Sequence, residues 1–287
     1  MKKSWNILNN VIKGITKDVK VGDMQLNSQQ YRALKSTRKD GTFLAGRPGL
    51  KYRWNPKEMP VEIADNIYEY NTHIVQKTIS TMNRKMCGCF KIRWKKHFNY
   101  RGPLDKTNNL CYRPATPEDI DKVLIQNDPT EYGCFSHVGK QNGTQIIQIS
   151  DDCFSERQVA HELFHSIGFY HEHARSDRDK YISINEDCIT EGLEDQFEIH
   201  PEALTYGLPY NPKSLMHYRT LDFTNGRCAT ITSKIPNVKD IDLGSAENVT
   251  DLDIEKVFKM YNCKPASKFS NLYTCRYVGK WFWTISF

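Results

Sequence analysis

One stretch in the middle of the chain has the residue types and spacing needed to bind a metal ion and use it. His161 and His165 are four positions apart, with Glu162 between them, in the pattern H-E-x-x-H. Residues four apart lie on the same face of a helix, so both imidazoles can reach one ion. Glu162 then lies beside them, where its carboxylate can accept a proton from a water at the metal. The pattern predicts a helix that carries a metal site.

The residues after this helix supply a third ligand. Gly168 is expected to end the helix, because glycine tolerates the left-handed backbone found at helix ends, and the turn brings back His171. Three protein ligands with one open position are typical of a catalytic zinc ion. The alternative, unrelated core or surface histidines, is disfavoured because four of the nine histidines fall between 161 and 173 and because the longer motif is specific. We expect one zinc ion per chain.

A second motif lies downstream, at Ser214-Leu215-Met216-His217-Tyr218. The long zinc motif is expected to be paired with a methionine-bearing turn. Met216 would form an apolar, polarisable floor beneath the three histidines. A methionine in such a segment is by itself more often core packing, so this interpretation depends on the first motif.

Together the two motifs resemble the signature of the astacin family of zinc endopeptidases, a branch of the metzincins. The resemblance rests on H-E-L-F-H-S-I-G-F-Y-H-E-H-A-R-S-D-R-D, from 161 to 179, and on S-L-M-H-Y, and it extends more weakly from Trp54 to Cys263. It implies an α+β, zincin-like catalytic domain with two lobes. A mixed sheet with long helices would form the first lobe, followed by the active-site helix and an irregular C-terminal lobe.

The resemblance also implies roles for individual residues. Glu172, after the third histidine, is the choice of this branch, and Tyr218 matches a tyrosine that can bind the zinc or swing off it. Val21–Gln30 is similar to the family's pro-segment, in which an aspartate, here Asp23, takes the zinc's open position. The family has a phenylalanine three residues earlier, where this chain has Lys20. A glycine–aspartate turn in a flexible leader is the alternative.

A latent precursor implies an activating cut. By resemblance, the new N-terminal ammonium would pair with Glu172. The candidate basic sites for the cut are Arg38, Lys39, Arg47 and Lys51. We expect residues 1–44 to form the pro-segment, 45–263 the catalytic domain, and 264–287 a tail left from a further module.

Nine cysteines predict an oxidising compartment. By resemblance, Cys134 pairs with Cys153, and Cys263 pairs with either Cys89 or Cys87. For the others the residues leave the connectivity open; the simplest pairing is Cys188–Cys228 and Cys87–Cys111, with Cys275 left over. Two sequons, at Asn142 and Asn248, would be usable outside the cell. We expect a secreted glycoprotein, although the first residues contain no apolar run of signal-peptide length. Either the start of the sequence is clipped or export is unconventional, and the cysteines and the resemblance favour a clipped start.

The composition limits the partners. Hydrophobic residues make up 39% and charged residues 26% of 287 positions, and the net charge is +6, as in an ordinary globular protein. The basic residues between Lys91 and Lys96 alternate with apolar ones, which predicts a strand rather than a nucleic-acid groove. No segment is apolar enough to span a membrane. We expect a monomer that binds neither nucleic acid nor membrane.

The flanking segments predict the elements that position the site. Val61–Ile63 reads as a first strand, and residues 67–86, with Tyr70 widening the apolar stripe, as a long helix. Residues 133–139 and 145–149 read as strands around a turn at Asn142-Gly143, the second forming the upper rim of a cleft where a peptide could bind as an added strand. Residues 97–111 look like an insertion, and Thr250 caps a final helix.

We therefore predict a zinc endopeptidase made as a zymogen, in which Glu162 is the general base and Tyr218 helps to stabilise the oxyanion. Its substrate would be a protein or peptide bound as an extended strand. The alternative is a catalytically silent secreted binding protein on the same scaffold with a structural zinc ion. The sequence leaves the physiological substrate and the cleavage specificity open.

Overall fold

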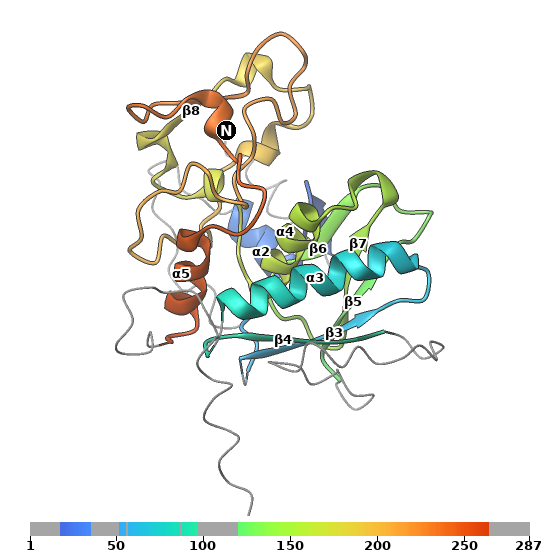
Figure 1. Ribbon diagram of the computed structural model, residues 1–287. Helices are drawn as coiled ribbons and strands as arrows, with labels where there is room; N and C mark the ends of the chain where they lie inside the picture. Colours follow the sequence, from blue (N-terminus) through green and yellow to red (C-terminus); the bar gives the residue numbers. More distant parts are fainter. Residues whose placement is uncertain (1–17, 36–51, 56, 87, 97–119, 264–287) are drawn as a thin grey trace, which may run out of the picture.

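The computed structural model describes residues 18–35, 52–55, 57–86, 88–96 and 120–263. Figure 1 shows two lobes on either side of helix α4 (Glu156–Ile167): a sheet with the long helix α3, and a lobe of short elements that includes helix α5. The predicted α+β, two-lobed fold is confirmed.

The first lobe is built on a seven-stranded mixed sheet in the order β1-β2-β6-β7-β5-β3-β4. The central pairings, β4 with β3, β3 with β5, and β5 with β7, are parallel, whereas β6 runs antiparallel to β7. The strands are β1 (Val19–Val21), β2 (Met24–Leu26), β3 (Glu58–Ile63), β4 (Lys91–Lys96), β5 (Lys122–Gln126), β6 (Cys134–His137) and β7 (Thr144–Ile149).

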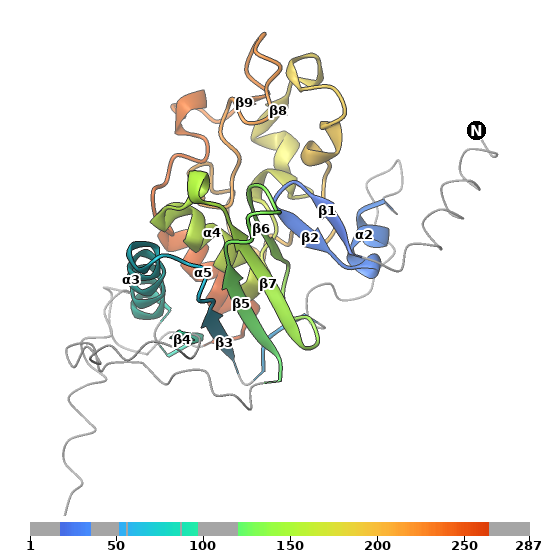
Figure 2. The ribbon, with the colours of Figure 1, turned by 90° about the vertical axis from the view of Figure 1, so that its right-hand side faces the viewer.

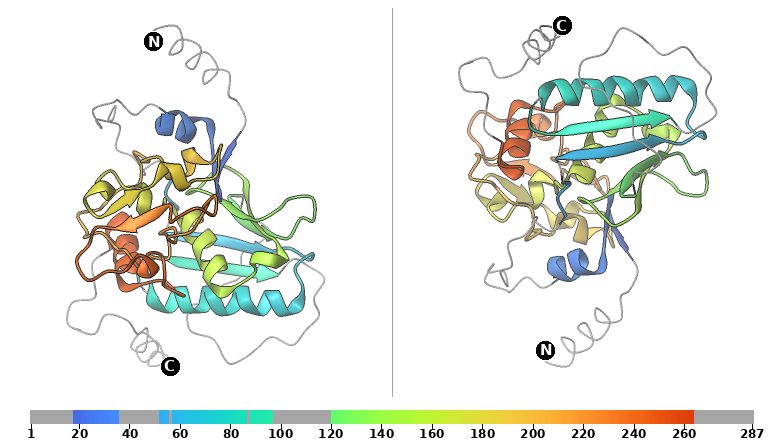
Figure 3. Two further views of the ribbon diagram at one scale, coloured as in Figure 1. Left: turned by 90° about the horizontal axis from the view of Figure 1, so that it is seen from above. Right: turned by 90° about the horizontal axis from the view of Figure 1, so that it is seen from below.

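The long helix α3 (Glu69–Lys85) forms where the apolar spacing predicts it. It buries Val75, Ile79 and Met82 in the main core, contacts α4, and runs along one side of the sheet (Figure 3). The expectation that Tyr70 widens the buried stripe is wrong, since this side chain is 77% exposed. Five positions before Val75, it points about 140° away around the helix.

The N-terminal segment extends the sheet at the edge nearest α4. Strands β1 and β2 form a hairpin, β2 pairs in parallel with β6, and α2 (Ser28–Lys35) follows beside them (Figure 2). A separate apolar cluster joins Met24 and Leu26 of this segment to Val138 of the sheet lobe and to Tyr170 and Ala203 beyond α4. The segment is therefore packed against both lobes.

This pairing corrects the prediction for the cleft's upper rim. Strand β7 was expected to be the exposed edge, but it lies between β5 and β6 and is hydrogen-bonded on both sides. The turn after β6 brings the chain back as β7, antiparallel to β6. The other edge of β7 then pairs with β5. Beyond the N-terminal hairpin, the last strand of the sheet on this side is therefore β6, and β2 covers its edge.

The basic residues of β4 lie in a strand, as predicted, and two of them, Arg93 and Lys95, pair with acidic residues of the neighbouring strand. Arg93 is buried and donates to Glu58 on the neighbouring β3 at 3.0 Å. Lys95 lies 3.8 Å from Glu62, which is also on β3, and Lys122 of β5 donates to Glu62 at 2.6 Å. Two of the four basic residues of β4 are thus paired with carboxylates of β3.

The C-terminal lobe is largely irregular. It contains short 3-10 helices, a two-stranded sheet of β8 (Ile182–Ile184) and β9 (Ile231–Ser233), and α5 (Asp251–Met260). Thr250 caps α5 as predicted, accepting from the backbone N–H of Asp253 at 3.2 Å.

Three disulfides tie the described residues together. They join Cys89 to Cys263, Cys134 to Cys153, and Cys188 to Cys228. The first links the approach to β4 with the end of α5, and the second links β6 with the approach to α4. The predictions for Cys87, Cys111, Cys275, the 97–111 insertion, the activation sites and the tail after 263 fall on residues outside those described.

Candidate metal centre

Helix α4 carries His161 and His165, and it ends at Ile167, shortly before His171. Ser155 caps its start by accepting from the backbone N–H of Gln158 at 3.1 Å. Gly168 ends it with a φ of +124°, and a Cβ there would lie 2.5 Å from the Met260 methyl group. Only glycine combines this backbone with such a close approach of α5. The helix end predicted from the sequence is confirmed.

Hydrogen bonds orient the first two rings. The Nδ1–H of His161 donates to the Leu215 carbonyl at 2.9 Å, and the Nδ1–H of His165 donates to the Phe169 carbonyl at 2.7 Å. Each Nε2 therefore carries a lone pair. Burial lowers the pKa of His165 to about 4, so its ring is neutral and able to bind a metal at neutral pH.

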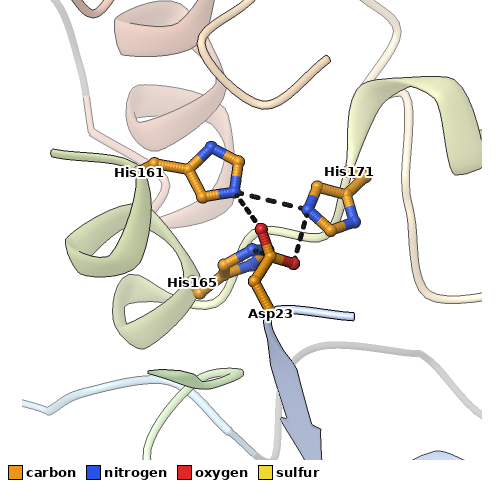
Figure 4. A group of neighbouring side chains, drawn as sticks. All are labelled: Asp23, His161, His165 and His171. Carbon is orange, nitrogen blue, oxygen red and sulfur yellow. Dashed lines mark hydrogen bonds and ion pairs between the residues drawn. The ribbon is translucent and has the colours of Figure 1, made fainter. Parts of the chain in front are cut away.

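The three histidines converge on one point with Asp23 (Figure 4). The Nε2 atoms of His161 and His171 lie 3.3 Å apart. Two ligands of a tetrahedral zinc ion with Zn–N bonds of 2.0–2.1 Å are separated by about 3.3 Å. The Nε2 of His165 is buried and has no hydrogen-bond partner, as expected of an atom whose partner is an ion. The donor set and its spacing fit zinc.

Asp23 occupies the fourth side of this group. Its carboxylate oxygens lie 3.0 Å from the Nε2 atoms of both His161 and His171, and 3.6 Å from that of His165. Burial alone would raise the pKa of Asp23, but the surrounding histidines, chiefly His171, hold it well below its usual range. The carboxylate is therefore an anion aimed at the metal position.

Contacts of the neighbouring backbone hold Asp23 in this position. The Ser136 N–H of β6 donates to the Asp23 carbonyl at 2.8 Å. Gly22 has a φ of +61°, and a Cβ there would lie 2.3 Å from the Gln196 side chain and 2.9 Å from the Tyr218 hydroxyl. Lys20, where the family pattern has phenylalanine, lies 3.8 Å from the centre of the Phe135 ring. This geometry is a cation–π contact, which holds the first strand of the segment against β6.

Glu162 is fully buried, with one oxygen held and one free. Gln158, one turn earlier on α4, donates to Oε1 at 2.7 Å, while Oε2 has no hydrogen-bond partner. Burial and, less strongly, Asp23 raise the pKa of Glu162 well above its usual value. A carboxylate with a raised pKa and a free oxygen is suited to take up and release a proton. Gln158 was not predicted from the sequence, although its spacing of four from Glu162 is a signal for such a contact.

The methionine-bearing turn is tied to the third histidine and to α5. The Glu172 N–H, next to His171, donates to the Met216 carbonyl at 2.8 Å, and Met216 is buried in the main core. From α5, the Asp253 carboxylate accepts from the Ser214 hydroxyl at 2.5 Å and from the Leu215 N–H at 3.2 Å. Because the Leu215 carbonyl orients His161, Asp253 supports a metal-binding ring. The sequence predicted the cap at Thr250 but not this role of Asp253.

Replacing Asp253 with alanine should lower the free energy of unfolding by about 3 kcal/mol, because this buried carboxylate accepts from both the turn and the Thr250 cap. Urea denaturation measures the change. Asp251→Ala, at an exposed position in the same helix, should cost far less. Equal denaturation midpoints for the two variants would contradict the assignment.

Tyr218 lies beside the site. Its ring stacks on His173 with centroids 3.9 Å apart and tilts against His171 at 4.5 Å. The hydroxyl is buried without a hydrogen-bond partner, under the Gly22 turn. Burial and the nearby Asp23 raise its pKa well above the usual value, so it remains a protonated donor.

Two buried histidines near the site make the fold sensitive to acid. Burial lowers the pKa of His200 to about 3 and that of His217 to about 4, whereas in the unfolded chain both titrate near 6.5. The folded state therefore has its full stability above about pH 6.5. As the pH falls below 6.5, each histidine lowers the free energy of unfolding by up to about 1.4 kcal/mol per pH unit. The urea midpoint should drop steeply between pH 6.5 and 4. His200→Gln should flatten the profile and the exposed His73→Gln should not; parallel profiles for these variants would refute the explanation.

Comparison with known proteins agrees with this geometry. The family model described as Astacin, a family of peptidases, matches residues 104–262, more than half of the chain. The chain belongs to the astacin family. The resemblance proposed from the zinc motif and the methionine turn is thereby confirmed.

Individual relatives support the assignment to the astacin family. Zinc metalloproteinase nas-14 of Caenorhabditis elegans is 39% identical over 166 residues, which cover 56% of this chain and 32% of that protein. Human meprin A subunit beta is 28% identical over 259 residues, covering 89% of this chain and 31% of that protein. The chain spans about a third of the length of these two relatives.

A solved structure shares the astacin fold. High choriolytic enzyme 1, a hatching enzyme zinc-protease from the medaka Oryzias latipes, matches with a TM-score of 0.58 and 25% identity, covering 74% of this chain and 94% of that one. Within the described part of the chain, no helix has the length and apolar character needed to cross a membrane.

Proposed function

We propose that the chain is the latent form of a secreted zinc endopeptidase. The observation that carries the proposal is the convergence of His161, His165 and His171 on one point, with Asp23 on the fourth side. One zinc ion per chain would be held by the three Nε2 atoms. A zinc ion in such a site polarises the scissile carbonyl and lowers the pKa of a bound water.

The chain's own residues supply the remaining chemistry. Glu162 would accept a proton through its free Oε2 and later pass it to the leaving amine. The Tyr218 hydroxyl, protonated and close to His171, would donate to the oxygen that becomes negative. Edge strand β6 would hold the substrate peptide as an added strand once β2 leaves it.

Latency and secretion belong to the same proposal. Asp23 takes the fourth side of the metal position, and strand β2 covers the strand edge where a peptide would bind. We propose that residues 1–44 act as the pro-segment and that a cut before the catalytic domain releases them. Three disulfides among the described residues support an oxidising compartment.

The test is a casein-cleavage assay on trypsin-trimmed protein. Trimmed protein should cleave casein, a zinc chelator should abolish cleavage, and added zinc should restore it. The uncut chain should be nearly inactive. The alternative, a silent binding protein with a structural zinc ion, predicts no zinc-dependent cleavage in any of these samples.

A further inference from the structure

Strand β6 has one face toward α4 and one face away from it. The hydroxyl of Ser136 on β6 lies 2.8 Å from that of Ser166 on α4, so the Ser136 side chain points to the helix. Because side chains alternate along a strand, those of Phe135 and His137 point to the opposite face. Asp23 and the metal position lie at the α4 side, and the opposite face, here called the outer face of β6, has no part in the metal site.

Two charged side chains of the N-terminal segment reach this outer face. The Lys20 ammonium lies 3.8 Å from the centre of the Phe135 ring and 3.4 Å from the Tyr132 carbonyl. The Asp18 carboxylate lies 3.0 Å from Nε2 of His137. Lys20 and Asp18 are two positions apart and therefore lie on one face of their strand. We call this pair of side chains, Asp18 and Lys20, the outer latch.

The strand register explains how β1 reaches a strand that it does not pair with. Lys20 is opposite Gln25 of β2, and Gln25 is opposite His137 of β6, so the three side chains form a row across neighbouring strands (Figure 2). A diagonal neighbour in such a row is within reach of a long side chain. Val19 and Val21, which alternate with Lys20, pack in the apolar cluster instead. Strand β1 therefore has apolar contacts on one face and charged contacts on the other.

The contact of Lys20 is large enough to affect how often the hairpin opens. Lys20 is exposed, whereas the Phe135 ring beneath it is only 7% exposed. The stem of a lysine covers apolar surface while its ammonium stays in water. An exposed cation over an aromatic face shifts an equilibrium by about two- to fivefold, which corresponds to about 0.5–1 kcal/mol. Loss of the Lys20 ammonium should therefore raise the open fraction of the hairpin by this factor.

We propose that the outer latch, with Lys20 as its main member, keeps the uncut chain latent separately from Asp23. Asp23 closes the metal position, whereas the outer latch keeps β2 paired with β6 and so keeps the strand edge covered. Lys20 is thus a positioning residue for the hairpin. The resembled pro-segment has phenylalanine at this place, so a charged latch is a property of this chain. The proposal rests on the proposed function, because latency applies only to a peptidase.

Hydrogen exchange of the uncut chain tests the latch without any cleavage. The Ser136 N–H donates to the Asp23 carbonyl, so its exchange rate measures how often β2 leaves β6. Mass spectrometry of peptides that contain β6 gives this rate, and casein cleavage by the uncut chain is the second measurement. Lys20→Gln removes the charge at similar length, and Lys20→Arg keeps it. Lys180→Gln, at an exposed position in the C-terminal lobe, is the matched control.

Lys20→Gln should speed exchange of β6 and casein cleavage by the uncut chain about two- to fivefold. Lys20→Arg and Lys180→Gln should match the native chain. In a Phe135→Leu background, Lys20→Gln should change exchange by less than twofold, because the ring is gone. Combined with Asp23→Ala, Lys20→Gln should multiply uncut cleavage by the same two- to fivefold factor, since the two side chains have different partners.

Native exchange in Lys20→Gln would overturn the proposal, and so would an undiminished effect of this substitution in the Phe135→Leu background. After trimming, Lys20→Gln should cleave casein at the native rate, because the segment that carries it is gone. A slower trimmed variant would show that the substitution acts on the catalytic domain instead, which also overturns the proposal. The expected exchange rates without cleavage by any trimmed chain would refute the peptidase function alone.

Discussion

Replacing Glu162 with glutamine should abolish casein cleavage by the trimmed chain while leaving its zinc content unchanged. Glutamine keeps the shape of the side chain and one oxygen to accept from Gln158, but it cannot take up the proton that leaves the attacking water. General acid–base catalysis contributes about 10²- to 10⁴-fold to rates, so the loss should fall in this range. Atomic absorption measures the zinc content and the casein assay measures the rate.

The Glu162 experiment has a matched control on the same helix. Glu156, at the first turn of α4, pairs with Lys77 on the surface, so Glu156→Gln should retain the native rate. Near-native cleavage by Glu162→Gln would remove the glutamate from its role as general base. A loss of zinc together with the rate would instead show that the side chain supports the metal site.

Replacing Asp23 with alanine should make the uncut chain active. The carboxylate lies against all three histidines, and breaking a buried interaction of this kind costs about 3–5 kcal/mol. If about 3 kcal/mol of the binding of the pro-segment is lost, the fraction of chains with an open site rises by about 10²-fold. Casein cleavage by the uncut variant should rise by a similar factor over the uncut native chain.

The control for Asp23 lies on the same segment. Asp18 contacts His137 of β6 at 3.0 Å and is not among the residues grouped at the metal position. Asp18→Ala should therefore raise casein cleavage by the uncut chain far less than Asp23→Ala does. After trimming, the native chain and both variants should be equally active. Equal activity of the uncut native chain and the uncut Asp23→Ala variant would show that Asp23 does not maintain latency.

Much of the candidate site was predictable because its geometry is local. The spacing of His161 and His165 and the place of Gly168 follow from one helix and its end, and the chain needs no distant contact to set them. The long helix α3 and the cap of α5 at Thr250 were predictable for the same reason. Apolar periodicity and helix capping both depend on residues close together in the sequence. The family motif then identified the third ligand and the methionine turn.

Predictions that depended on strand neighbours were less secure. The alternation in residues 145–149 identified a strand correctly but could not show on which side its partners lie, and β7 is internal to the sheet. Strand pairing is decided by which distant segments meet, and the alternation within one strand does not show which segments those are. The pairing of β2 with β6, which covers the cleft edge, is of the same kind.

By itself, the sequence determined the metal-binding motif, the helix that displays it and the aspartate suited to oppose it. Only the tertiary structure decided which groups hold these residues in place. Asp253 reaches Ser214 across 39 positions, and Lys256 reaches Glu172 across 84. Buried charges require partners within a few ångströms, but nothing in the spacing of such residues along the chain records which ones the packed lobes will bring together.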